Sequence, residues 1–323
     1  RHGLIAAAIE SFDAIAAASD SAGFADLGDA ARTHAASVRF LAGDPAAASR
    51  DLRTLLARPN GPGSKLRCDA VVGLVDALAA QDSVAAGLLV LSSNRSILAG
   101  RLSAADQLRL SLATGRLLNA NGEYPAAIDT LIGVADTAAR LGLVGHQLQA
   151  LPEAARAAVA LQRQDQALAL LTRARDVWLI ERGLPADPEW REIYGAQSRL
   201  IATELAGLTL TDSAIPASER LRKAFDGLQT FKARTLRERM LGPGAVTGTT
   251  TICDLATLQQ KVLTAGEVFL DCSIGPHRSL IFAVTRDTCV VVEGLGDETL
   301  GPRLRRFHRL LAAPSRGELS VRS

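Results

Sequence analysis

Apolar residues recur at spacings of three and four through the first two-thirds of the chain, and the breaks between them are rich in Gly, Pro, Asn and Asp. This spacing places apolar side chains on one face of a helix, and those four residues are typical of turns. Alanine and leucine, both strong helix formers, dominate the same region. We therefore predict a series of helices, joined by short polar turns, from the N-terminus to residue 241.

The helical region contains an internal repeat. A polar turn followed by a helix with a small residue in its first turn occurs four times, at Ala48, Ala86, Ala127 and Ala167. We predict helix–turn–helix units in which this small residue lets the second helix approach the first closely. An apolar residue four positions later then fills the groove between them. Because one such hairpin cannot bury its apolar faces alone, several units must stack.

The third unit has the most specific pattern, in which Gly115 is followed by Gly122, Tyr124 and Ala127. This order of small residue, glycine, aromatic residue and alanine resembles the tetratricopeptide repeat (TPR). The period of about 40 is longer than the standard repeat of about 34 and resembles the long variety. The resemblance implies an α–α superhelix whose concave face is built from the first helix of each unit. An unrelated helical solenoid with the same hairpins is the alternative.

The chain changes in character after the fourth unit. Two further helices are predicted at 190–205 and 217–240, followed by a Gly- and Thr-rich linker at 242–251. Beyond the linker we predict a short helix capped by Asp254, three strands in an antiparallel meander, and a last helix. Their ranges are 255–263 for the short helix, 267–274, 278–285 and 288–292 for the strands, and 300–312 for the last helix.

The stretch from about 230 to 312 contains several short motifs without a catalytic group, and the order in which they occur resembles that of a known family. Leu258-Gln259 and Gly266-Glu267 precede the first strand, and Val284-Thr285-Arg286-Asp287 closes the second. This order, after a TPR-like array, resembles the opening of a CHAT domain, a caspase-like peptidase domain that accompanies TPRs in bacteria. The predicted domains are a TPR-like array at 1–241, the linker at 242–251 and the N-terminal portion of a CHAT-like α/β domain at 252–323. The fold class is mostly α, a superhelix of hairpins followed by a partial caspase-like α/β domain.

The CHAT resemblance implies a cysteine peptidase with a His–Cys dyad, in which a His-Gly pair supplies the base and a later cysteine the thiolate. After the meander the sequence has no such order, because His277 lies in a turn and no cysteine follows His308. We assign no catalytic residue, interpret the chain as a piece of a longer protein, and expect it to be inactive by itself. The alternatives are a non-enzymatic TPR scaffold with a docking meander, or a helical-repeat regulator related to neither family.

The repeat register predicts a partner-binding surface on the concave face. It places Arg109, Arg116 and Asn119 of the third unit there, with Gln149 and Arg156 of the fourth. Two guanidinium groups one repeat apart would suit the carboxylates of an acidic peptide. The alternative is that these arginines are solvated or pair with local acids. The second unit contributes an apolar surface there, namely Cys68, Val71, Val75 and Leu78.

Composition and charge bear on whether the protein binds nucleic acid, crosses a membrane or contains disulfides. Hydrophobic residues make up 48% and charged residues 22%, as in ordinary globular proteins, and the net charge of +2 gives no case for nucleic acid. Basic clusters at 220–239 and 303–309 are interpreted as solvated or interdomain faces. No apolar run reaches the ~18–20 residues of a membrane helix. Four scattered cysteines favour free thiols in a reducing cytoplasm. The sequence predicts no cofactor and no metal, and leaves a homo-oligomer open.

Overall fold

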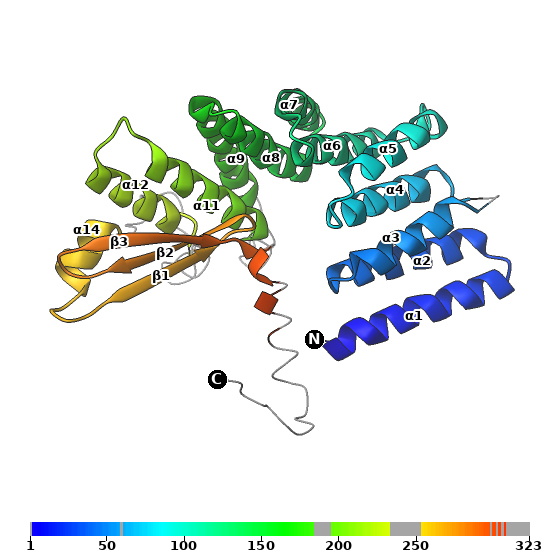
Figure 1. The fold of residues 1–323 in the computed structure, drawn as a ribbon, viewed down its shortest axis with the longest axis horizontal. Coiled ribbons are helices and arrows are strands. Elements are labelled where there is room, and N and C mark those ends of the chain that lie inside the picture. Colours follow the sequence, from blue (N-terminus) through cyan, green and yellow to red (C-terminus); the bar gives the residue numbers. More distant parts are fainter. Residues whose placement is uncertain are drawn as a thin grey trace, which may run out of the picture. The chain divides into compact units, whose positions relative to one another are not determined.

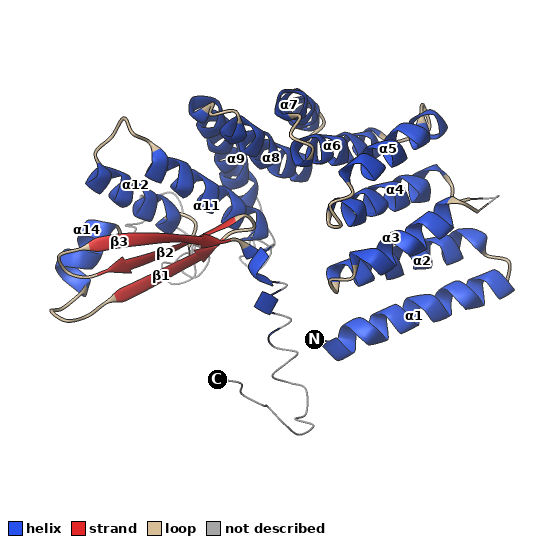
Figure 2. Cartoon of the chain, in the orientation of Figure 1, coloured by secondary structure: helices blue, strands red, loops and turns tan. Residues whose placement is uncertain are grey.

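The computed structural model describes residues 2–58, 61–183, 195–232 and 253–297, together with 299–301, 303, 304 and 307. These residues are mostly helical, with one small three-stranded antiparallel sheet (Figures 1 and 2). They form two compact units, Arg1–Val177 and Trp178–Ser323. The mostly helical prediction and the antiparallel meander are confirmed.

The first unit consists of consecutive helices joined by short turns. They are α1 (His2–Ser21), α2 (Ala25–Leu41), α3 (Pro45–Leu56), α4 (Ser64–Ala79), α5 (Val84–Leu98), α6 (Ala104–Ala120), α7 (Tyr124–Arg140), α8 (Val144–Ala160) and α9 (Gln164–Gly183), the last of which continues into the second unit. Each helix from α1 to α7 packs on the next, and α2, α4, α6 and α8 also pack in series. The predicted units are thus α2–α3, α4–α5, α6–α7 and α8–α9.

Each predicted unit turns at a residue with positive φ. These residues are Gly43, Asp82, Gly122 and Gln162, with φ of 86°, 54°, 79° and 59°. A buried small residue follows five positions later in every unit, and the four are Ala48, Gly87, Ala127 and Ala167. Ala86 is therefore wrong as a member of the set, because it is half-buried and its neighbour Gly87 occupies the close-packed position. The corrected register places equivalent residues 39, 40 and 40 apart.

The close approach predicted for the third unit is confirmed. Leu131, four residues after Ala127, is fully buried against Gly115 on α6. A Cβ at Gly115 would lie 2.6 Å from the Cγ and Cδ2 atoms of Leu131, so only glycine fits there. A glycine also packs against a leucine between two units. A Cβ at Gly87 on α5 would lie 2.9 Å from a methyl carbon of Leu117 on α6. Small residues therefore set the distances between helices in this unit.

The second unit packs helices on one face of the sheet. Its helical elements are α11 (Gly195–Thr211), α12 (Ala217–Gln229), α14 (Leu255–Thr257) and the π-helical turn η3 (Leu258–Val262). The strands are β1 (Phe269–Ile274), β2 (Arg278–Val284) and β3 (Cys289–Leu295), in the order β1-β2-β3. Asp254 caps α14 as predicted, accepting a hydrogen bond of 2.7 Å from the Thr257 N–H.

One apolar core joins these helices to the sheet. Phe225 and Leu228 of α12 and Ala202 of α11 share it with Leu280 and Phe282 of β2. The rings of Phe225 and Phe282 meet edge to face, with centroids 5.6 Å apart. The helix pair that precedes the predicted linker therefore belongs to the same compact unit as the sheet, which begins at Trp178. The linker at 242–251 lies outside the described residues and stays a prediction.

The second helix of that pair is shorter than expected in the described part of the chain. The helix α12 ends at Gln229, and residues 230–232 form a turn. Residues 184–194 and 233–252 fall outside the described part, and so does Trp190, the predicted start of the preceding helix. Lys232 in the turn forms an ion pair with Asp271 of β1, which ties the end of α12 to the sheet.

Candidate partner-binding site

Charged side chains and one glutamine lie in register on the first helices of three successive units. Asp69, Arg109 and Gln149 occupy equivalent positions on α4, α6 and α8, and Asp76, Arg116 and Arg156 form a second such row seven residues later. Two turns of helix separate the rows, so both lie on the same side of each helix. We call this surface the ladder face; it comprises Asp69, Asp76, Arg109, Arg116, Glu153 and Arg156.

Three of the five predicted site residues meet at Glu153. The Arg116 Nε lies 3.5 Å from one carboxylate oxygen of Glu153, and an Arg156 guanidinium nitrogen lies 2.7 Å from the other. The Asn119 side-chain amide donates a hydrogen bond of 2.8 Å to the Glu153 carbonyl oxygen. One acidic residue of α8 therefore forms ion pairs with two arginines that stand one repeat apart.

Arg109 is held in the same manner at the other end of the ladder face. It forms an ion pair with Asp69 of α4 and lies 3.5 Å from a carboxylate oxygen of Asp106. Burial and the positive charge of Arg109 lower the pKa of the neighbouring His146, against the opposing effect of Asp106. Burial also raises the pKa of the Cys68 thiol to about 11, so this cysteine is poorly suited to act as a nucleophile.

The bases of the ladder face are more exposed than the acids that hold them. The side chains of Arg109, Arg116 and Arg156 are 38%, 37% and 41% exposed. Their partners Asp69 and Glu153 are 24% and 12% exposed. A guanidinium group has five N–H donors, so one that is fixed from beneath by a carboxylate can still present donors outward. The ladder face thus combines ordered arginines with solvent access.

The carboxyl group of Asp76, a half-buried member of the ladder face, has a raised pKa. Burial raises the pKa of its carboxyl group, and Glu153 acts in the same direction, whereas Arg116 and Arg109 lower it. Because burial is the largest of these effects, the net direction is upward. The environment of Asp76 therefore disfavours its charge even with two arginines nearby.

The structure corrects the predicted contribution of the second unit. Cys68, Val71, Val75 and Leu78 are all buried and do not form a surface. Asp69 and Asp76 stand at the positions equivalent to Arg109 and Arg116, because the register set by Ala86 is one residue out. Gln149 is exposed, as the prediction requires.

Asp69 and Glu153 are the members of the candidate site that sequence reasoning missed. Glu153 is the single acidic residue of α8 and directly follows Pro152, a signal that could have identified it. Asp69 precedes Arg109 by one full repeat and would have been found with the turn-based register. The alternative in which the arginines pair with local acids therefore describes their contacts.

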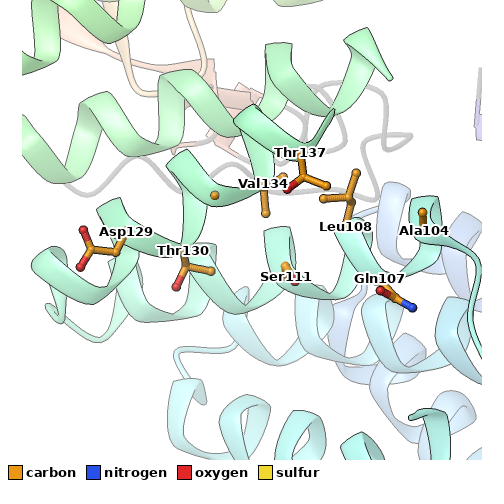
Figure 3. A pocket seen from close by; sticks show the side chains of 9 residues that line it. Ala104, Gln107, Leu108, Ser111, Asp129, Thr130, Val134 and Thr137 are labelled. Carbon is orange, nitrogen blue, oxygen red and sulfur yellow. The ribbon is translucent and has the colours of Figure 1, made fainter. Parts of the chain in front are cut away.

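Two grooves lie away from the ladder face. Figure 3 shows the first, of about 400 Å³, in which Ser111 of α6 lies across from Thr130 and Val134 of α7. The second, of about 550 Å³, lies between α4, α5 and α6 and has leucines in its wall, including Leu88, Leu98 and Leu110. Neither groove contains a predicted site residue.

The described part of the chain holds no group of three or more His, Cys, Asp or Glu that is arranged to bind a metal ion. None of its helices is both long and apolar enough to cross a membrane. Burial raises the pKa of Cys289, while Cys253 and Cys272 are exposed. Comparisons with protein-family models, with curated proteins and with solved structures gave no match to this chain.

Proposed function

We propose that the helical region is a TPR-like α–α superhelix that binds a protein or peptide on its concave face, and that it is the regulatory portion of a bacterial CHAT-type cysteine peptidase. The observation that carries the binding proposal is the ladder face, where equivalent positions of successive units bear ordered charges. Stacked hairpin units commonly present such a surface, built from their first helices, to extended peptides.

An acidic segment is the partner that this chemistry favours. Arg109, Arg116 and Arg156 are fixed by carboxylates yet remain more than a third exposed. Pre-ordered guanidinium groups lose less side-chain entropy when a ligand carboxylate arrives, and they can bind it through two N–H groups at once. Several glutamates of an acidic peptide could then bind to different arginines of the ladder face.

Binding of a fluorescein-labelled glutamate-rich peptide, followed by anisotropy with the full chain, tests this proposal. The double variant Arg109→Gln/Arg156→Gln should weaken binding by roughly tenfold or more, and salt should weaken it in the wild type. Arg173→Gln is the matched control, because Arg173 is also 38% exposed and pairs with Asp136 at 2.7 Å, but on α9 and α7. Equal weakening by both variants, or no binding at low salt, would reject the ladder face as the site.

The peptidase part of the proposal rests on the CHAT-like motifs in the second unit. The second candidate, a non-enzymatic scaffold, is favoured by the single core that joins the meander to α11 and α12, as a docking module would require. The coding sequence beyond Ser323 distinguishes the two. A peptidase requires roughly 100 further residues with a His-Gly and then a Cys, each after an apolar strand. A stop codon directly after Ser323 would leave the scaffold as the function.

A further inference from the structure

The groove beside Leu88 and Leu98 is lined by apolar side chains from three helices. Its volume of about 550 Å³ falls within the range of small-molecule sites, which is about 300–1,000 Å³. Val71 of α4 lines the groove and is fully buried. Leu91 and Leu98 of α5 and Leu110 of α6 also line it. The groove is therefore large enough for a small apolar ligand, which would contact three helices at once.

One positive charge stands within this apolar lining. Four of the residues that α5 contributes to the groove are spaced by three, four and three positions and so lie on one side of the helix, namely Leu88, Leu91, Arg95 and Leu98. Among the described residues that line the groove, Arg95 is the only charged one. It occupies a position in a stripe that otherwise consists of leucines.

Arg95 is available to a ligand. It is exposed, and it forms no ion pair within the described part of the chain. The arginines of the ladder face differ in this respect, because Arg109 pairs with Asp69 and Arg156 pairs with Glu153. An arginine without an internal acid keeps its N–H donors for an incoming anion.

A second arginine lies next to the lining. The Arg67 guanidinium donates a hydrogen bond of 3.3 Å to the side-chain oxygen of Asn94, which lines the groove beside Arg95. The Asn94 amide nitrogen donates in turn to the Val90 carbonyl oxygen at 2.9 Å, so this side chain is held in place. No described residue of the lining is acidic. The groove near Asn94 and Arg95 is therefore positively charged and favours an anion.

Three further polar side chains of the lining are already hydrogen-bonded to the backbone. Each donates to a carbonyl oxygen nearby in the chain, and the three are Ser92, Gln107 and Thr114. Because these donors are in use, the groove is poorly suited to a sugar or a nucleotide, which needs many polar contacts. The chemistry of the groove instead suits a ligand with an apolar body and a single negative group.

We propose that this groove binds a free fatty acid, with the carboxylate on Arg95 and the alkyl chain against the leucines of α5 and α6. A guanidinium group can bind a carboxylate through two N–H groups at once, and the alkyl chain leaves water when it contacts the leucines. Seven residues of helix separate Arg95 from Leu88, a distance of about 10 Å, which an alkyl chain of medium length spans. No residue of the ladder face lines the groove, so this inference does not rest on the proposed function.

Binding of dansylaminoundecanoic acid, a fatty acid whose emission rises in apolar surroundings, tests this proposal with the full chain. We expect the emission to rise on binding and decanoate to displace the probe. Decanol has the same alkyl chain without the charge and should compete at least about tenfold less well. Arg95→Gln should weaken binding of the probe by about tenfold or more. Arg101→Gln is the matched control and should have little effect, because Arg101 is exposed but does not line the groove.

A diazirine derivative of decanoate, photo-crosslinked to the full chain and located by mass spectrometry, tests the position of the ligand. Crosslinks should fall on α5 and α6 beside Leu91 and Leu110. Crosslinks that gather on the exposed apolar residues of the sheet, such as Leu270 and Val292, would overturn the proposal. No rise in probe emission, equal competition by decanol, or equal weakening by both arginine variants would also overturn it. Binding to vesicles of anionic phospholipid without binding of monomeric decanoate would do the same, because a lipid surface would then be the ligand.

Discussion

Arg116 of α6 and Glu153 of α8 form an ion pair across two successive repeat units, with Nε and Oε1 3.5 Å apart. The same carboxylate holds Arg156, which occupies the position of Arg116 in the next unit. A residue that binds two equivalent arginines contributes both to the contact between units and to the order of the ladder face. Stability and binding should therefore both fall when this carboxylate is removed.

Glu153→Gln should lower the free energy of unfolding by about 1 kcal/mol, because it removes the charged partner of two arginines that are themselves more than a third exposed. It should also weaken binding of the glutamate-rich peptide, since Arg116 and Arg156 lose the carboxylate that holds them in place for the ligand. Urea unfolding and anisotropy measure the two effects. Asp136→Asn is the control, because its pair with Arg173 is 54% exposed on the acid side and should matter by less than about 0.5 kcal/mol. Equal losses of stability in both variants would contradict the role given to Glu153.

Gly115→Ala should destabilise the first unit by about 1–3 kcal/mol, because the new methyl group would lie 2.6 Å from carbons of the fully buried Leu131. The matched control is Gly133→Ala on α7, where the new methyl group meets nothing within 4 Å. That variant should be up to about 1 kcal/mol more stable than the wild type, from helix propensity alone. Thermal unfolding distinguishes them; a Gly115→Ala variant as stable as Gly133→Ala would show that the close approach of α6 and α7 is not required.

Asp76→Asn should become more favourable relative to the wild type as the pH rises from about 4 to about 7. Burial raises the pKa of the Asp76 carboxyl group, so its contribution to stability is present below its ordinary pKa and is lost as the pH rises through the raised value. The asparagine variant stays neutral and does not lose that contribution. Thermal unfolding of both proteins as a function of pH measures the difference.

Asp20→Asn provides a control of opposite sign for that pH series. A hydrogen bond from Arg32 lowers the pKa of Asp20, so its contribution is present above its ordinary pKa and is lost as the pH falls through the lowered value. Asp20→Asn should therefore become less favourable relative to the wild type as the pH rises. The same pH trend in both variants would contradict the assigned environment of Asp76.

Much of the fold was predictable because its signals are local. Helical spacing, turn residues and the small residue after each turn identify the hairpins, and short apolar runs separated by Gly275-Pro276 and a second tight turn identify the meander. The register failed in the second unit because Ala86 and Gly87 are both small, and only packing shows that Gly87 lies against Leu117 of α6. The shared core of α12 and the sheet was also missed, because contacts across 40 or more residues leave no local pattern.

The candidate site was predictable in its arginines and not in its acids. Arg109, Arg116 and Arg156 follow from the repeat spacing, but Asp69 and Glu153 acquire their role only through contacts between neighbouring units. An exposed arginine and a paired one look the same in a sequence. Whether Arg116 and Arg156 are paired depends on the position of Glu153 between them. That position depends in turn on how closely α6 approaches α8.

The most direct test of the binding proposal is to map where an acidic peptide lies on the full chain. A glutamate-rich peptide with a central benzoylphenylalanine is photo-crosslinked, and the modified residues are identified by mass spectrometry. We expect crosslinks on α6 and α8 beside Arg109, Arg116 and Arg156, and their loss in Arg109→Gln/Arg156→Gln. Crosslinks that gather instead in the groove beside Leu88 and Leu98, or in the second unit, would contradict the assignment of the ladder face as the partner-binding site.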